Sequence, residues 1–264
     1  MDEEEYAAEV ARTVPRYLYK YRSLAGDSKE FTRDLIINQN LYFPAPADLN
    51  DPFECKPNLE TLATIDQQKR YAAGLVNRTQ AGKPRAERKR LIKGIRADRA
   101  QFRQTILVSM RATLEAVGVY SLSARHLSLL MWPHYADNHR GVCVRFDMQA
   151  LLNAEQVPFP VQYEDQRPTC DTILEPTAEW LNKAVLTKGQ PWEYEQEWRL
   201  VRNRGAKTTL RLTAPTVNGV LLGANISDSD RAEVRQWVRD AGRPVGVAQA
   251  KFHPTAYELE IANE

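Results

Sequence analysis

Trp192-Glu193-Tyr194-Glu195-Gln196-Glu197-Trp198-Arg199-Leu200-Val201 places glutamates at alternate positions directly before an alternating run of aromatic and aliphatic residues. We interpret this stretch as a β-strand, in which side chains alternate between two faces, so that Glu193, Glu195 and Glu197 share one face. Like charges this close repel one another, and folding alone gives little reason to collect them. The stretch is therefore either an exposed edge strand with a solvated acidic face or part of a functional site.

The composition is that of an ordinary soluble globular protein. Hydrophobic residues make up 43% of the 264 positions, charged residues make up 27%, and the formal net charge is +2. That length is enough for one large domain or two small ones with a sizeable core. Because the net charge is close to zero, it selects no class of partner.

Several features favour a cytoplasmic protein without a membrane anchor. No apolar run approaches the roughly 20 residues that a membrane-spanning helix needs. The first residues, Met1-Asp2-Glu3-Glu4-Glu5, are acidic where a signal peptide is basic and then apolar. The cysteines Cys55, Cys143 and Cys170 are odd in number and follow no metal-ligand spacing, which fits a reduced compartment.

Periodicity predicts strands at both ends of a long helical segment. We expect strands at 17–22, 40–43, 119–123, 141–146, 161–163, 208–213, 217–222, 245–252 and 257–261. Residues 62–117 are helical in pattern, with a break near Gly82-Lys83-Pro84. The expected fold is a single α+β domain over 15–262, in which small antiparallel or mixed β-sheets are flanked by helices. Residues 60–117 form a helical insertion in it, and residues 1–14 are an N-terminal tail or short helix.

Lysine and arginine dominate residues 83–103, where Glu87 and Asp98 are the only acidic residues. The apolar residues of this helix recur at near-helical spacing, so the basic side chains fall on its remaining faces. They form either the charged outer face of an amphipathic helix or a contact for nucleic acid. No aromatic residue that could stack on a base is interleaved before Phe102, which belongs to the apolar stripe.

Polar and aromatic motifs are spread along the chain. They are Tyr19-Lys20-Tyr21-Arg22-Ser23-Leu24, Leu41-Tyr42-Phe43, Asn50-Asp51-Pro52-Phe53-Glu54, Ser121-Leu122-Ser123, Leu130-Met131-Trp132, His134-Tyr135-Ala136-Asp137, Gly141-Val142, Tyr194-Glu195 and Glu197-Trp198-Arg199. With them, the chain resembles a bacterial domain-of-unknown-function family, the one numbered 2971, over roughly residues 17–260. The family name implies no activity, so the function has to come from the residues.

Three of these motifs follow one another in the order Arg22, then Ser121 with Ser123, then Glu195 with Glu197. This order resembles the arginine–serine–glutamate arrangement of ADP-ribosyltransferases, in which two small sheets form a cleft that holds NAD. The resemblance implies NAD as substrate, with Arg22 on its phosphates and Ser121 near the nicotinamide ribose. It also implies that Glu197 hydrogen-bonds that ribose and stabilises oxocarbenium-like charge, while Glu195 orients or deprotonates the acceptor.

Further residues would complete the cofactor site that this resemblance implies. Trp132 or Tyr135 would stack on the nicotinamide ring, and Tyr21, Ser123 and His134 belong to the same motifs. The acceptor of the ADP-ribose would be a protein or a nucleic acid. Each of these residues also has a purely structural interpretation: a core aromatic for Tyr21, an outward strand position for Ser123, and a cap of the proline break for His134.

Arg22 has a structural interpretation as well, since it could pair with Asp51 or Glu54. A metal-dependent nuclease or phosphohydrolase is a competing hypothesis for the carboxylates. Asp51, Glu54, Glu195 and Glu197 could bind Mg²⁺ while the basic helix holds a phosphate backbone.

A non-catalytic nucleotide- or protein-binding module is the third hypothesis, although no glycine-rich loop that cradles phosphate is present. The three hypotheses make different demands on the fold. The transferase requires Arg22, Ser121 and Glu197 around one cleft, whereas the nuclease requires several carboxylates within reach of one metal ion. The binding module requires neither arrangement.

Overall fold

The computed structural model describes residues 14–60, 62–171 and 173–262. Its strands are β1 (Tyr17–Arg22), β2 (Asn40–Phe43), β3 (Asn58–Leu59), β4 (Gly118–Ser123), β5 (Val142–Asp147), β6 (Phe159–Pro160), β7 (Gln162–Glu164), β8 (Thr169–Cys170), β9 (Thr187–Gly189), β10 (Glu197–Arg202), β11 (Thr208–Arg211), β12 (Val217–Leu222), β13 (Gly246–Phe252) and β14 (Leu259–Ala262). Its helices are α2 (Ser28–Asn38), α3 (Ile65–Thr79), α4 (Arg85–Ala97), α5 (Arg99–Glu115), α6 (Met131–Tyr135), α7 (Met148–Asn153), α8 (Thr177–Val185) and α9 (Asp228–Asp240), with the 3-10 helices η1 (Pro46–Asp48) and η2 (Gln190–Glu195).

A mixed eight-stranded sheet forms the centre of the described structure, in the order β14-β13-β12-β5-β1-β4-β10-β6. Strands β12 and β13 are parallel, and the other neighbours in this sheet are antiparallel. Two-stranded sheets pair β11 with β2, β3 with β8, and β7 with β9. The α+β class is confirmed, but the main sheet is larger than the small sheets that the sequence suggested.

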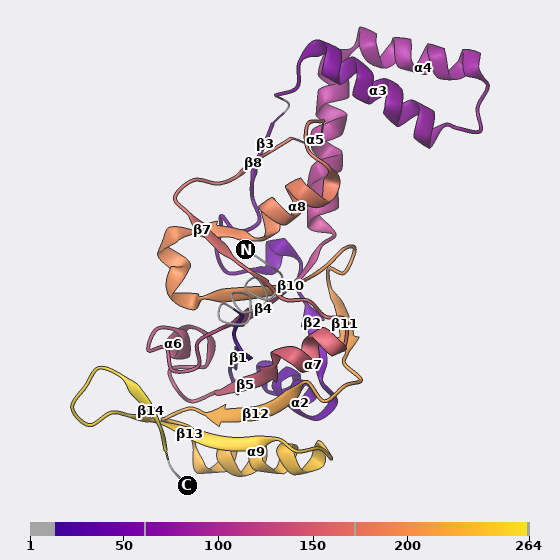
Figure 1. Ribbon diagram of the computed structural model, residues 1–264. Helices are drawn as coiled ribbons and strands as arrows, with labels where there is room; N and C mark the ends of the chain where they lie inside the picture. The colour runs from indigo at the N-terminus through magenta and orange to yellow at the C-terminus, as the bar shows by residue number, and fades with distance from the viewer. Residues whose placement is uncertain (1–13, 61, 172, 263–264) are drawn as a thin grey trace, which may run out of the picture.

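The main core lies between this sheet and the helices α2 and α9, which pack beside each other (Figure 1). Leu35 and Ile36 of α2 and Trp237 of α9 are buried in it, together with strand residues such as Leu18 and Val144. The apolar residues of α2 and α9 recur at helical spacing, so each helix turns one face toward the sheet. A second core joins α5 and α8 to the far side of β4.

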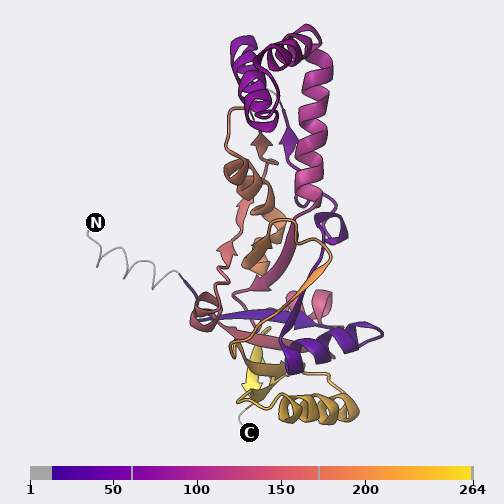
Figure 2. The ribbon, with the colours of Figure 1, turned by 90° about the vertical axis from the view of Figure 1, so that its right-hand side faces the viewer.

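The helical segment expected at 60–117 consists mainly of α3, α4 and α5. In both views α3 and α4 lie at the opposite end of the molecule from α9, and α5 leads back to the sheet (Figures 1 and 2). The expected break near Gly82 is confirmed, and a second break falls at Asp98, whose carboxylate caps α5 by accepting from the Gln101 amide at 2.9 Å. Leu91, one of the apolar residues of this segment, is 38% exposed because α4 lies away from the core.

Two expectations concern the whole chain rather than one element. No helix within the described residues is long and apolar enough to cross a membrane. The tail or short helix expected at residues 1–14 falls, apart from Val14, outside the described ranges.

Candidate functional site

A cavity of about 260 Å³ lies where two neighbouring strands of the main sheet diverge. Strand β1 pairs with β5 along its whole length, and β4 pairs with β10 in the same way. Between β1 and β4, however, the register holds one residue pair, Tyr19 with Ser123. Residues of β1, β4 and β10 line the opening together with residues from the loop after η1, from α6 and from β9.

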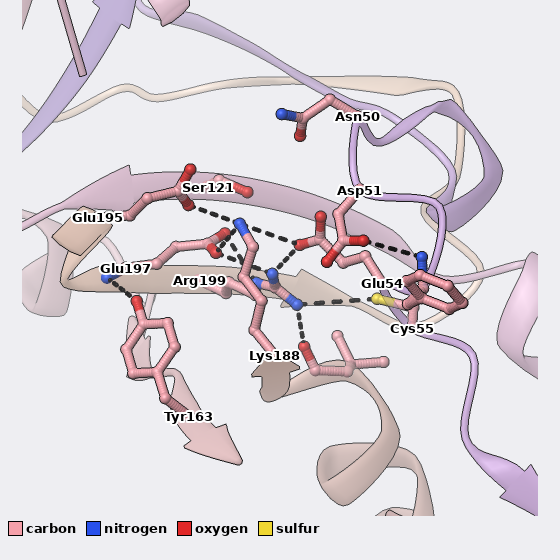
Figure 3. A network of polar contacts seen from close by, with 12 residues as sticks. Asn50, Asp51, Glu54, Cys55, Ser121, Tyr163, Lys188, Glu195, Glu197 and Arg199 are labelled. Atoms are coloured by element: carbon pink, nitrogen blue, oxygen red, sulfur yellow. Dashed lines mark hydrogen bonds and ion pairs between the residues drawn. The ribbon is translucent and has the colours of Figure 1, made fainter. Parts of the chain in front are cut away.

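A buried cluster of opposite charges forms one wall of this cavity (Figure 3). The Lys188 ammonium lies 2.5 Å from Glu195 Oε2, 3.0 Å from Glu197 Oε2 and 3.8 Å from Glu54 Oε1. All four side chains are less than 5% exposed. Burial of charges at this density is tolerated only when each is paired and hydrogen-bonded.

Arg199 completes the charge cluster from below the cavity wall. Its Nε and Nη2 donate to the two oxygens of Glu197 at 2.8 and 2.9 Å, in the paired geometry that a guanidinium favours. Nη2 also contacts Glu54, and Nη1 donates to the carbonyl of Val185. Arg199 is fully buried, so its charge is balanced by these carboxylates rather than by water.

The pKa values within the cluster follow from burial and charge pairing. Burial by itself raises the pKa of Glu197, but Arg199 and Lys188, with hydrogen bonds from Arg199 and Ser121, outweigh it and hold the pKa at about 2. Burial raises the pKa of Glu54, and the nearby Arg199 opposes that shift only in part. Of these two carboxylates, Glu54 is therefore the one that takes up a proton first as the pH falls.

Glu195 and Glu197 differ in how many hydrogen-bond acceptor positions their carboxylates leave free for a ligand. A carboxylate offers about four such positions. Those of Glu197 are taken by two donors of Arg199, by Lys188 and by the Ser121 hydroxyl. Within the described residues, the side-chain oxygens of Glu195 accept hydrogen bonds from Lys188 at 2.5 Å and from the Tyr135 hydroxyl at 2.5 Å. Glu195 thus lines the cavity with about two acceptor positions unused.

The glutamate stretch is not one continuous strand. Residues Gln190–Glu195 form the 3-10 helix η2, and Gln196, in the left-handed region with φ of 42°, links it to β10, which begins at Glu197. Glu193 is consequently exposed and hydrogen-bonded to Gln190, whereas Glu195 and Glu197 both reach the cavity. The expectation of three glutamates on one strand face is wrong, because Glu193 and Glu195 lie in a 3-10 helix, in which side chains two positions apart do not share a face.

Arg22 does not line the cavity. Its Nε donates to the Thr32 hydroxyl of α2 at 3.4 Å, and burial lowers the pKa of its guanidinium. It pairs with neither Asp51 nor Glu54, so its structural interpretation is also wrong in detail. Both faces of β1 are at least partly buried, and Tyr19, Lys20 and Tyr21 all line the cavity, so alternation along the strand does not explain why Arg22 lies outside it. The requirement that Arg22, Ser121 and Glu197 surround one cleft is met for Ser121 and Glu197 only.

The aromatic and histidine candidates separate into cavity and core positions. Tyr135 and Tyr21 line the cavity, and the Tyr21 hydroxyl donates to the Arg125 carbonyl at 2.9 Å. Trp132 is fully buried, and its indole donates to the His126 carbonyl, so it is a core residue rather than a stacking platform. His134 is exposed and stacks near Tyr194 outside the cavity, with ring centroids 6.3 Å apart.

Ser123 lines the cavity but acts on the backbone. Its hydroxyl donates to the Glu195 carbonyl at 2.6 Å and accepts from the Arg125 amide at 3.0 Å. Ser123 therefore fixes the turn that carries Glu195, which is a positioning role.

The carboxylates converge on cations rather than around a space for a metal ion. Among the described residues, no group of three or more His, Cys, Asp or Glu is arranged to hold a metal. Lys188 and Arg199 fill the space between Glu54, Glu195 and Glu197. The Asp51 carboxylate accepts from the Phe53 amide at 2.9 Å and so sets a turn. The described residues therefore lack the arrangement that the nuclease hypothesis requires, in which several carboxylates surround one metal ion.

Lys20, Tyr163 and Lys188 were not predicted from the sequence to belong to the site, and Arg199 was assigned no role in it. Arg199 offered a signal, because it follows Glu197 by two residues in a stretch that is predicted as a strand and must therefore share its face. Tyr163 accepts from the Glu197 amide at 2.7 Å, and Lys188 comes from the separate strand β9. No local pattern marks either of them.

Comparison with known proteins gives one match. A family model described as a protein of unknown function (DUF2971) matches residues 131–200. The expected resemblance is thereby confirmed over this segment, which holds Tyr135, Lys188, Glu195, Glu197 and Arg199. No curated protein and no solved structure matches the chain.

The depressed pKa of Glu197 predicts a loss of stability in acid. A group whose pKa is lower in the folded state than its ordinary value of 4.5 stabilises the fold above that pH, and this contribution disappears as the pH falls toward about 2. Urea unfolding between pH 7 and pH 2 should therefore show a smaller acid loss in Glu197→Gln than in the unmodified protein. Equal losses in both proteins would contradict this account.

Proposed function

We propose that the cavity between β1, β4 and β10 binds the nicotinamide ribose of NAD, and that the chain transfers ADP-ribose to a protein or nucleic acid. The observation that carries this proposal is the position of Glu195, a carboxylate with unused acceptor positions, beside tyrosine rings in the cavity. Ser121 and Glu197 also lie together there, as the resemblance to ADP-ribosyltransferases implies.

The chemistry requires negative charge next to the sugar. The bond between the nicotinamide nitrogen and ribose C1′ breaks, the electron pair leaves with neutral nicotinamide, and the sugar acquires oxocarbenium character. An acceptor nucleophile then bonds to C1′ and releases its proton. Glu195 would accept a hydrogen bond from a ribose hydroxyl. It would also stabilise the cationic sugar, since a fixed carboxylate in a water-poor site interacts strongly with developing positive charge.

The other cavity residues suit the same ligand. Tyr19, Tyr21 and Tyr135 offer aromatic surface for a flat heterocycle. The volume of about 260 Å³ lies below the roughly 300–1,000 Å³ of typical ligand pockets. The cavity would therefore enclose the nicotinamide ribose half of NAD and leave the adenosine half outside.

The roles of the two glutamates differ from those that the resemblance implies. Because the acceptor positions of Glu197 are filled, we assign it a fixed charge that holds Lys188 and Arg199 in place. Glu195 takes the contact with the ribose. Arg22 takes no part, since it lies outside the cavity lining.

Nicotinamide release tests the proposal. The protein is incubated with NAD, alone and with a protein extract or RNA, and free nicotinamide is measured by chromatography. We expect release above that of a heat-inactivated sample, and transfer of label from adenine-labelled NAD to one of the acceptors. Binding of NAD without any release would instead favour a non-catalytic nucleotide-binding module, and neither binding nor release would overturn the proposal.

Tyr135→Phe is expected to reduce nicotinamide release by roughly tenfold, the effect of losing one hydrogen bond to a charged group. The Tyr135 hydroxyl accepts from Asn50 at 2.9 Å and donates to Glu195, so its removal leaves the carboxylate less well oriented. Tyr194→Phe is the matched control, because Tyr194 is a neighbouring ring that does not line the cavity. Equal rates for the two variants would remove Tyr135 from the mechanism.

A further inference from the structure

Two lysines line the cavity, and they differ in their partners. Lys188 is ion-paired with Glu54, Glu195 and Glu197. None of the ion pairs among the described residues involves Lys20. The Lys20 ammonium donates to the Ser121 carbonyl at 2.8 Å and lies 4.7 Å from the centre of the Tyr120 ring. Because an ammonium carries three donors, about two of them remain for a ligand.

The fold gives little reason to keep a lysine at this position. Lys20 is partly buried, and a partly buried ammonium without an ion pair loses hydration that a carbonyl and an aromatic face replace only in part. Glu195 and Glu197 lie near enough to act on Lys20, but their charges are committed to Lys188 and Arg199. Burial, together with the like charge of Arg22 on the same strand, lowers the pKa of Lys20 to about 8.

The cavity thus offers a ligand free hydrogen-bond acceptor positions on Glu195 and free hydrogen-bond donor positions on Lys20. A ligand that satisfies both has a cationic or hydroxylated part and an oxyanion. Simple apolar or wholly cationic ligands would leave Lys20 unpaired.

We propose that Lys20 binds an oxyanion of the ligand and that this oxyanion is a phosphate group. The inference rests on the proposed function for its ligand, in which the oxyanion is a diphosphate oxygen of NAD. A charge-assisted hydrogen bond from an ammonium to a phosphate oxygen is among the strong ones in proteins. Lys20 thereby takes the role that the sequence order implies for Arg22, two residues further along β1.

Calorimetric titration of the full chain tests this assignment with three probes: NAD, inorganic pyrophosphate, and nicotinamide riboside, which has the heterocycle and sugar but no phosphate. Lys20→Met should weaken binding of NAD and pyrophosphate by roughly 10–100-fold, the worth of a hydrogen bond to a charged group. Binding of nicotinamide riboside should change by no more than about twofold, and Lys20→Arg, which keeps the charge, should retain most of the affinity.

Arg22→Met is the matched control, because it removes a cation of the same strand that lies outside the cavity lining. It should leave the affinities for NAD and pyrophosphate unchanged. Loss of phosphate binding in Arg22→Met but not in Lys20→Met would overturn the proposal, as would equal loss for all three probes in Lys20→Met. Failure of the unmodified protein to bind either phosphate-bearing probe would overturn it too.

The two proposals fail in different ways. If the protein binds pyrophosphate through Lys20 but releases no nicotinamide, the transferase activity is wrong and the oxyanion site stands. If nicotinamide is released at the same apparent NAD affinity in Lys20→Met, the activity stands and the oxyanion site is wrong. Folding of Lys20→Met is checked by its melting temperature, which should not fall, because the substitution removes an unpaired charge.

Discussion

Arg199→Met is expected to lower the free energy of unfolding by about 3–5 kcal/mol, the usual cost of removing one partner from a buried ion pair. Arg199 is fully buried and bonds both oxygens of Glu197 as well as Glu54. Without it, two carboxylates remain in the interior with Lys188 as their nearest cation. For a chain of this size, the melting temperature should fall by roughly 10 °C.

Arg211→Met serves as the control for this prediction, because Arg211 is exposed on β11. Its effect should stay within about 0.5 kcal/mol. Adding Glu54→Gln to Arg199→Met should recover part of the lost stability, since it removes one of the two stranded charges. Urea titrations of the single and double variants measure both effects. A loss in Arg199→Met no larger than that in Arg211→Met would show that the cluster does not stabilise the fold.

Glu195→Gln is expected to reduce nicotinamide release by about 100-fold or more, comparable to the loss of one charge-stabilising group in other active sites. The substitution keeps the shape of the side chain, but it removes the negative charge that would face the cationic sugar and replaces one of the two oxygens that accept from Tyr135 and Lys188 by a donor. Lys188 retains Glu54 and Glu197 as partners, so the wall of the cavity should survive.

Glu193→Gln is the matched control for this prediction, because it makes the same chemical change two residues away on the exposed side of η2. It should leave the rate within about twofold, given that it lies in no contact with the cavity. Rates of nicotinamide release are measured for both variants at a temperature well below their melting temperatures, so that both are folded. Unchanged activity in Glu195→Gln would remove the carboxylate from the reaction and favour a binding role for the cavity.

Much of the strand framework could be predicted from local pattern. Alternating residues predicted β1, β4 and the second half of the glutamate stretch as strands, and all three are neighbours in the main sheet. The motif order also placed Ser121 and Glu197 at one site, and both line the cavity. These predictions hold because side-chain alternation is a local property of an extended backbone.

Orientation within the site was less accessible to the sequence. Both faces of β1 are at least partly buried, so alternation could not tell which of Lys20, Tyr21 and Arg22 reaches the cavity. The 3-10 helix before Gln196 was also missed, because Trp192 to Val201 alternates as a strand does while the backbone turns within it. Because a 3-10 helix has three residues per turn, Glu193 faces solvent while Glu195, two positions later, faces the cavity.

Local sequence determined which segments are extended and where glutamate, serine and tyrosine stand along them. Beyond Arg199, which stands two residues after Glu197, the rest of the charge cluster was assembled by the fold: Lys188 comes from β9, and Glu54, a further partner of both cations, comes from the loop after η1. Charges in a water-poor interior must find opposite charges through space, and any part of the chain can supply them. For that reason the sequence could show that the glutamates were unusual, whereas the packing of strands and loops settled which of them remains available to a ligand.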